Sequence, residues 1–136
     1  MNKQIYLNTH TSDLKRAITF FEGLGFTFDP KFTDENAGAL IISPDITIMI
    51  LNNPFFKGFI GSKEVVDTTK NSEMIICINA ETREAVDQLV EKAFELGAAK
   101  SNEPYDYGWM YGRSFLDLDG HNWEVAYLDP AGPQPE

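Results

Sequence analysis

The chain has 136 residues, 43% of them hydrophobic and 24% charged, which is the size and composition of one soluble globular domain. Its 21 acidic and 11 basic residues give a net charge of −10, which excludes nucleic acid and anionic membranes as partners and favours neutral or cationic ligands. No apolar run approaches the ~20 residues that a membrane span needs. The chain begins without a signal-peptide core, and its single cysteine, Cys77, lies in an apolar run, so we expect a cytoplasmic protein without an intrachain disulfide.

The first half of the chain predicts a strand, a helix and a hairpin in that order. Alternation indicates the strands, and apolar residues at helical spacing between a capping side chain and Gly25 indicate the helix. The expected elements are a strand over 4–10, a helix capped by Ser12 or Asp13, a short strand over 26–29, and hairpin strands over 39–43 and 46–51.

Periodicity lapses over 52–71, although this segment carries aromatic residues, Phe55 and Phe56 among them. A connector of this length is uncommon in a compact domain and is often functional. It fits a lid over a binding site, and it fits equally a plain interdomain or dimer-contact segment.

The second half of the chain repeats the order of the first. Its expected elements are a strand over 73–79, a helix that Glu81 or Thr82 opens and Gly97 ends, and strands over 109–117 and 121–128 that meet at the Asp119-Gly120 turn. The last residues, 129–136, are rich in proline and polar side chains, and we expect a frayed tail.

The two halves match as one βαβββ unit that occurs twice. Gly97 and Gly25 end the two helices at an offset of 97 − 25 = 72 residues, and the hairpin turns lie at about the same offset. We therefore expect an α+β fold with eight strands, in which two modules form mixed sheets that enclose a cleft. The expected single domain spans 1–128, with module 1 over about 4–52, a connector over 53–71 and module 2 over about 72–128, followed by a flexible tail over 129–136.

Glu124 is the residue that simple strand packing explains least. Side chains alternate along 121–128, so that Trp123 and Val125 share one face and Glu124 lies on the other. Both faces are mostly apolar, and an acid on a covered face must be paired, neutralised or bound to a metal. Glu124 is therefore our candidate catalytic residue. The alternatives are a structural ion pair with an arginine such as Arg113 and an acid that lines a wet cleft.

The segment 105–113 is rich in flat side chains close to an arginine. If the strand is regular, Trp109, Tyr111 and Arg113 share one face, whose charge suits a ligand wall better than a dry core. Aromatic rings supply stacking and cation–π contacts to a planar or cationic ligand. Alternating aromatics also arise from packing, so core packing is the competing interpretation.

The chain resembles the vicinal oxygen chelate superfamily in three features: the duplication, the run Asp117-Leu-Asp-Gly-His-Asn-Trp-Glu124, and Asp13-Leu14 followed by Phe20-Phe21-Glu-Gly-Leu-Gly-Phe26. That superfamily includes glyoxalase I, extradiol dioxygenases, fosfomycin-resistance enzymes and bleomycin-resistance proteins. The resemblance covers about residues 4–128 and implies the glyoxalase/bleomycin-resistance fold. It is less specific for activity, because this fold hosts unrelated chemistries.

In enzymes of that superfamily, a divalent metal is held by the first and last strands of both modules. The resemblance puts the module 2 positions on Glu73 and Glu124. It puts the module 1 positions on Tyr6 and on Met49 or a neighbour, in a run where Thr47 is the only oxygen ligand. Only the two carboxylates suit a metal, and a catalytic site generally needs at least three protein ligands. His10 is the candidate third ligand for a metal such as Zn, Ni, Mn or Fe, although a histidine at a strand end also serves as a cap.

Bleomycin-resistance proteins of the superfamily lack the metal ligands and are similar to acidic dimers that sequester a cationic drug in aromatic-lined clefts. The charge and the aromatic residues of this chain match that description, and the incomplete set of metal ligands favours it. We therefore expect a homodimer that binds a small organic molecule; the alternative is a glyoxalase-like lyase, isomerase or dioxygenase that uses a divalent metal. His121, at the hairpin turn, is interpreted as structural. The expected ligand-binding residues are Asn8, Phe55, Phe56, Trp109, Tyr111 and Arg113.

Overall fold

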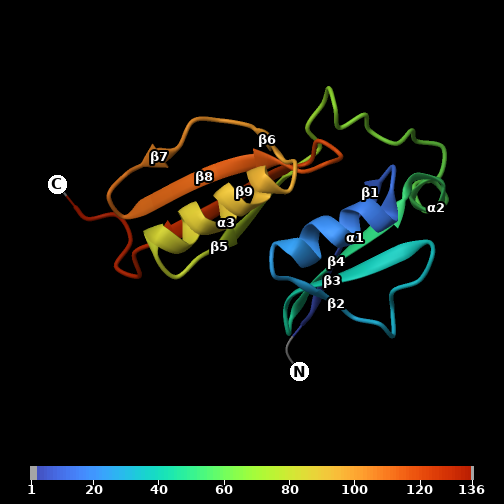
Figure 1. Cartoon of the computed structure of the whole chain (residues 1–136), viewed down its shortest axis with the longest axis horizontal. Helices are drawn as coiled ribbons and strands as arrows, with labels where there is room; N and C mark the ends of the chain where they lie inside the picture. The colour runs from blue at the N-terminus through green and yellow to red at the C-terminus, as the bar shows by residue number, and fades with distance from the viewer. Residues whose placement is uncertain (1–2, 136) are drawn as a thin grey trace. The chain divides into compact units, whose positions relative to one another are not determined.

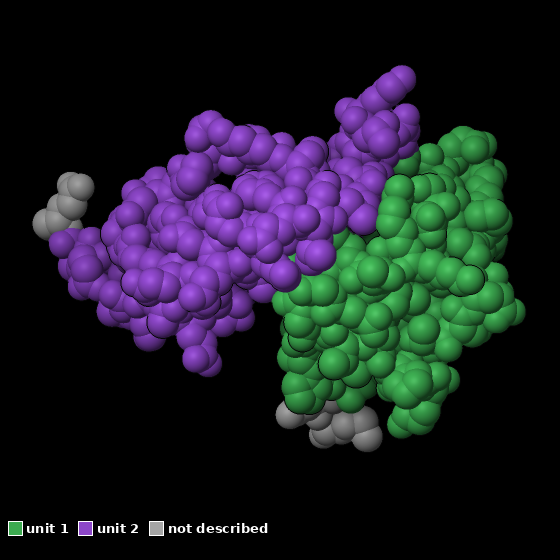
Figure 2. Space-filling model, viewed as in Figure 1, with its two compact units in different colours: residues 1–66 green, residues 67–136 purple. Residues whose placement is uncertain are grey.

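The computed structural model of the chain describes residues 3–135, which form two compact units that divide between Val66 and Asp67 (Figures 1 and 2). The division falls inside the segment 53–71 that the sequence marks as a connector. Unit 1 contains β1 (Ile5–Thr11), α1 (Leu14–Gly23), β2 (Thr27–Phe28), β3 (Ala37–Ser43), β4 (Ile46–Asn52) and α2 (Asn53–Lys57). Unit 2 contains β5 (Ile75–Asn79), α3 (Arg83–Glu95), β6 (Ala99–Lys100), β7 (Tyr105–Asp106), β8 (Met110–Leu116) and β9 (Asn122–Leu128).

Each unit has a mixed sheet of the same topology, which confirms the predicted duplication. The order of strands is β1-β4-β3-β2 in unit 1 and β5-β9-β8-β6 in unit 2, where β7 adds to β8. In both sheets the first strand lies parallel to the last strand of its unit, and the other pairs are antiparallel. The α+β fold predicted from the sequence is thus confirmed.

The two long helices begin and end at the residues that the sequence indicated. The side chain of Asp13 accepts a hydrogen bond from the Arg16 amide at 3.1 Å, and Thr82 caps α3 in the same way through the Ala85 amide at 3.0 Å. Gly25 and Gly97 follow the helix ends with positive φ angles of 102° and 106°, which a residue without a Cβ adopts at little cost.

Each helix covers one face of its own sheet and leaves the other face to the functional residues. The apolar stripe of α1 is buried with residues of β3 and β4, including Leu40 and Ile48. In unit 2, Val86 and Val90 of α3 are fully buried, as is Trp123, whose ring stacks parallel to a neighbouring core phenylalanine. Side chains alternate along strands, so the faces opposite α1 and α3 carry the second set of side chains from each sheet.

Three details differ from the sequence-based expectation. The connector contains a helical turn, α2, because Asn52 caps it by accepting from the Phe55 amide and Pro54 suits its first turn. Residues 3–135 contain nine strands rather than eight, because Tyr105 and Asp106 pair with the edge of β8. Strand β5 begins two residues after Glu73, so Glu73 precedes the strand in which it was expected.

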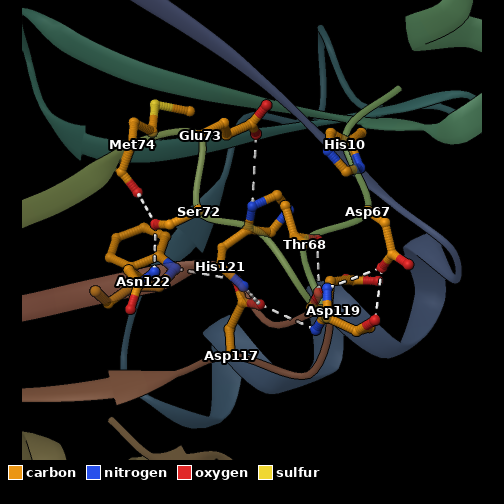
Figure 3. Close-up of polar contacts among 12 residues, drawn as sticks. His10, Asp67, Thr68, Ser72, Glu73, Met74, Asp117, Asp119, His121 and Asn122 are labelled. Atoms are coloured by element: carbon orange, nitrogen blue, oxygen red, sulfur yellow. Dashed lines mark hydrogen bonds and ion pairs between the residues drawn. The ribbon is translucent and has the colours of Figure 1, made fainter. Parts of the chain in front are cut away.

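The connector also packs on the turn between β8 and β9, within unit 2. Thr68 donates its hydroxyl to the carbonyl oxygen of Asp119 at 2.7 Å (Figure 3). The neighbouring Gly120 has a φ of 86°, and a Cβ on it would lie 2.4 Å from the carbonyl oxygen of Thr68. Glycine is therefore required twice at this position, for the backbone angle and for the close approach of the connector. In the described part of the chain, no helix is both long and apolar enough to cross a membrane.

We predict that Gly120→Ala destabilises the protein more than Gly25→Ala does. Both glycines have positive φ, which costs an alanine roughly 1–2 kcal/mol. Only Gly120 faces a clash, whereas a Cβ on Gly25 would meet nothing within 4 Å. Overpacking adds about 1–3 kcal/mol to the loss at Gly120. Urea denaturation of both variants measures the difference, and equal losses would contradict the role of the Thr68 contact.

Candidate ligand-binding and metal-binding residues

Unit 1 has a cavity of about 660 Å³ on the sheet face opposite α1, which we call the unit 1 cleft. Its aromatic side chains, Tyr6 and Phe32, are 60% and 65% exposed, so their rings are accessible to a ligand. The other lining residues are mostly small, apolar or uncharged: Gln4, Asn8, Asp29, Ala39, Ile41, Ser43, Pro44, Thr47 and Met49. The cleft therefore combines flat surfaces with hydrogen-bonding groups and a single carboxylate, that of Asp29.

The register of the strands shows which residues of unit 2 correspond to this cleft. The central row across the sheet reads Asn8, Met49 and Ala39 in unit 1, and Cys77, Glu124 and Ser114 in unit 2. The next row pairs Tyr6 with Thr47 in unit 1, and Ile75 with Asn122 in unit 2. Ile75, and not Glu73, is therefore the counterpart of Tyr6, because the segment before β5 is not yet in the sheet.

Glu124 lies on the face opposite α3, and its partner is a tyrosine. Its Oε1 accepts a hydrogen bond from the Tyr105 hydroxyl at 3.0 Å. The Tyr105 ring reaches it by crossing Gly112, where a Cβ would lie only 2.2 Å from the ring carbon Cζ. The alternative pairing with Arg113 does not occur, because that guanidinium binds two acids of α3, Asp87 and Glu91.

The charge of Glu124 changes its surroundings. Burial, the hydrogen bond to Glu124 and the charge of that carboxylate together raise the pKa of Tyr105 well above its ordinary value. Partial burial and the same charge raise the pKa of the Cys77 thiol, which stays protonated and weakly nucleophilic at neutral pH. This face of unit 2 thus presents a carboxylate and a neutral phenol.

Tyr111 and Arg113 lie on the opposite face of the sheet, under α3. The Tyr111 hydroxyl donates to Asp87 Oδ1 at 2.6 Å, and the Arg113 guanidinium donates to Asp87 at 3.2 Å and to Glu91 at 2.8 Å. The predicted sharing of one face is confirmed for these two residues, but the acids of α3 occupy their polar groups. Alternation along β8 could not tell which face the helix covers.

His10 is a buried histidine at the end of β1, with 4% of its surface exposed. Its Nδ1 lies 3.1 Å from the amide oxygen of Asn53, and its ring centroid lies 5.1 Å from that of Phe56. If Nδ1 donates to this oxygen, Nε2 is the ring nitrogen that could bind a metal. Phe55 instead packs edge-on against Phe59, at the exposed side of α2.

Glu73 lies beside His121, in unit 2 (Figure 3). Its Oε1 is 3.7 Å from His121 Nδ1, and the two side chains are 21% and 6% exposed. This distance exceeds that of a hydrogen bond, and the contact is an ion pair only when His121 is protonated. His121 is therefore a candidate metal ligand that the sequence analysis assigned to structure alone. In the sequence, the position of His121 between the turn glycine Gly120 and Glu124 was the one indication that it could belong to a site.

We predict that Glu124→Gln lowers the pKa of Tyr105 toward the ordinary value of about 10. The substitution removes the charge, while the amide oxygen still accepts the phenol proton. Asp87→Asn is the matched control, because it lowers the pKa of Tyr111, which Asp87 raises by a hydrogen bond, and leaves Tyr105 unchanged. Titration of the tyrosine ¹³Cζ signals by NMR measures both. A Tyr105 pKa that is unaffected by Glu124→Gln would contradict the pairing.

This raised pKa also predicts the dependence of stability on pH. The unfolded chain releases the Tyr105 proton at about pH 10, before the folded chain does. The contribution of Tyr105 is therefore fully present below pH ~10 and is lost as the pH rises above it. In Tyr105→Phe, the free energy of unfolding should fall less steeply above this pH.

Comparison with known proteins places the chain in a family. A family model described as the Glyoxalase/Bleomycin resistance protein/Dioxygenase superfamily matches residues 5–125. A hypothetical protein from S. aureus is 30% identical in sequence, and its structure agrees with a TM-score of 0.77 over 93% of this chain and 94% of that one. A comparison with curated proteins finds no match.

Two more distant structures share the fold. A glyoxalase/bleomycin resistance protein/dioxygenase family enzyme from Burkholderia phytofirmans PsJN is 19% identical, with a TM-score of 0.76 over 93% of this chain and 99% of that one. The bleomycin resistance determinant encoded on the transposon Tn5 is 17% identical, with a TM-score of 0.65 over 94% of this chain and 99% of that one. Because the family match spans most of the sequence and both units have the expected topology, the chain belongs to the Glyoxalase/Bleomycin resistance protein/Dioxygenase superfamily.

Proposed function

We propose that this protein binds a small organic molecule in the unit 1 cleft and does so without a metal. One observation carries the proposal. Tyr6 and Met49, the positions where the resemblance puts metal ligands in module 1, both line this cleft. A neutral phenol and a thioether are poor ligands for a divalent metal, but both offer suitable contact surfaces to an organic molecule.

The lining of the cleft indicates the ligand class. Its volume of about 660 Å³ lies in the usual range for small-molecule sites. Tyr6 and Phe32 offer exposed rings for a flat group, and Asn8 and Thr47 offer hydrogen-bonding groups. The Asp29 carboxylate and the net charge of −10 disfavour anions. The ligand is thus expected to be a partly flat, neutral or cationic molecule. Family analogy adds homodimerisation, which analytical ultracentrifugation would test.

We predict that Tyr6→Ala and Phe32→Ala each weaken ligand binding at least several-fold with little loss of stability. Both rings are mostly exposed, so their removal creates no cavity in the core. Phe59→Ala is the matched control, because that ring is 70% exposed and lies outside the cleft. A library of small molecules screened by thermal shift supplies the ligand, and calorimetry measures its affinity. Unchanged affinity in both cleft variants would refute the proposed site.

A metal-dependent lyase, isomerase or dioxygenase is the second candidate function, and the contact between Glu73 and His121 favours it. A histidine and a carboxylate are suitable ligands for Zn, Ni, Mn or Fe. The metal would polarise oxygen atoms of the substrate as a Lewis acid. Glu124 would then serve as the proton acceptor, with one oxygen oriented by Tyr105.

Metal removal separates the two functions. If the protein is a metal-independent binder, EDTA leaves the ligand affinity unchanged, and elemental analysis after dialysis finds no stoichiometric metal. If it is a metalloenzyme, about one metal per chain survives dialysis and is lost in Glu73→Gln and in His121→Asn. Glu81→Gln is the matched control for these variants, because it removes the same charge from an exposed position that no candidate site uses. Metal retention in the wild type would overturn our first proposal.

A further inference from the structure

A second cavity, of about 530 Å³, lies wholly within unit 2 and shares no residue with the unit 1 cleft. It is formed by the turn between β7 and β8 on one side and by the C-terminal segment on the other. We call it the tail groove; its lining residues are Tyr107, Gly108, Trp109, Asp129, Gly132, Pro133 and Gln134. The proposed binding function in unit 1 does not use it.

The walls of the groove are tied to the fold. Arg83, at the start of α3, binds Asp106 through two hydrogen bonds of 2.7 and 3.1 Å, and donates a third to the carbonyl oxygen of Gly108 at 2.9 Å. The Asp129 amide donates to the carbonyl oxygen of Trp109 at 2.7 Å, which joins the C-terminal segment to the turn. The β7–β8 turn and the start of the C-terminal segment are thus positioned before any ligand arrives, which lowers the entropic cost of binding.

The chemistry of the groove combines aromatic faces with one carboxylate. Tyr107 is 67% exposed, and Trp109 is half-buried beside it in the lining. Asp129 accepts a hydrogen bond from the Ala131 amide at 2.9 Å, and no salt bridge to it occurs among residues 3–135. The nearby charge of Arg83 is matched by Asp106.

We propose that the tail groove binds a small quaternary ammonium group. Aromatic faces attract cations through their quadrupoles, and the carboxylate adds charge complementarity. A primary ammonium needs several acceptors to replace its water, and beyond the one carboxylate the side chains here supply only the neutral oxygens of Tyr107 and Gln134. A quaternary ammonium is weakly hydrated and requires none. The groove is large enough to hold a whole small cation of this kind.

Choline and its uncharged isostere 3,3-dimethyl-1-butanol test the proposal directly. The chain has two tryptophans, and their indole N–H signals report separately by NMR. Trp109 lines the groove, whereas Trp123 is buried and donates its indole N–H to Asp117 at 3.0 Å, so Trp123 is an internal reference. Choline should shift the Trp109 signal saturably and leave Trp123 unchanged. The isostere should bind at least fivefold more weakly.

Two variants locate the site. Asp129→Asn should weaken choline binding at least fivefold, whereas Glu81→Gln, which removes the same charge from an exposed position outside the groove, should not. Tyr107→Leu should weaken binding several-fold without lowering the melting temperature, because its ring is mostly exposed. Equal binding of the isostere, or the absence of a saturable Trp109 shift at 100 mM choline, would overturn the proposal. Neither result would affect the proposed function of the unit 1 cleft.

Discussion

The parallel pairing of the first and last strands in each unit is the constraint on which the candidate sites depend. Parallel neighbours cannot be joined by a tight turn, so the chain returns through a long connection. In each unit this connection begins with a helix, which covers one face of the sheet. The pairing puts Asn8 beside Met49 in unit 1 and Cys77 beside Glu124 in unit 2. The side chains on the face that the helix covers form the core, and the unit 1 cleft and Glu124 lie on the opposite faces of their sheets.

The same framework carries different chemistry in the two units. Unit 1 has Met49 at the central position, within a largely uncharged cleft, and unit 2 has Glu124 at the corresponding position. A partly covered carboxylate needs a donor, and the Tyr105 hydroxyl supplies one only because Gly112 has no side chain. One glycine in β8 therefore determines the partner of the acid.

The motif between Asp117 and Glu124 has a structural explanation that is independent of any metal. One oxygen of Asp117 accepts the amide hydrogens of Asp119 and His121 (Figure 3). The other accepts the indole N–H of Trp123. Burial raises the pKa of this carboxyl, and the charge of His121 and the three donors oppose that effect. The motif therefore closes the turn and anchors the core tryptophan. This explains why it identifies the fold better than the activity.

The sequence alone determined the elements of this protein, because their signals are local. Helix caps such as Asp13 and Thr82, the glycines after both helices and the alternation along strands depend on near neighbours, and the duplication can be read from their spacing. Alternation also put Glu124 on the face opposite Trp123. The sequence analysis did not predict the short strand β7 or the short helix α2, because a two-residue edge strand and a five-residue helix leave little periodicity.

Only the tertiary structure decided the partners of the candidate site residues. Alternation separates two faces of a strand but does not say which face a helix covers, so Tyr111 and Arg113 lie under α3 instead of on the open face. Glu73 meets His121, 48 positions away (121 − 73 = 48), because the connector folds over the β8–β9 turn. Contacts of this kind join segments that are distant along the chain. They depend on how the folded segments pack against one another, which no local sequence pattern records.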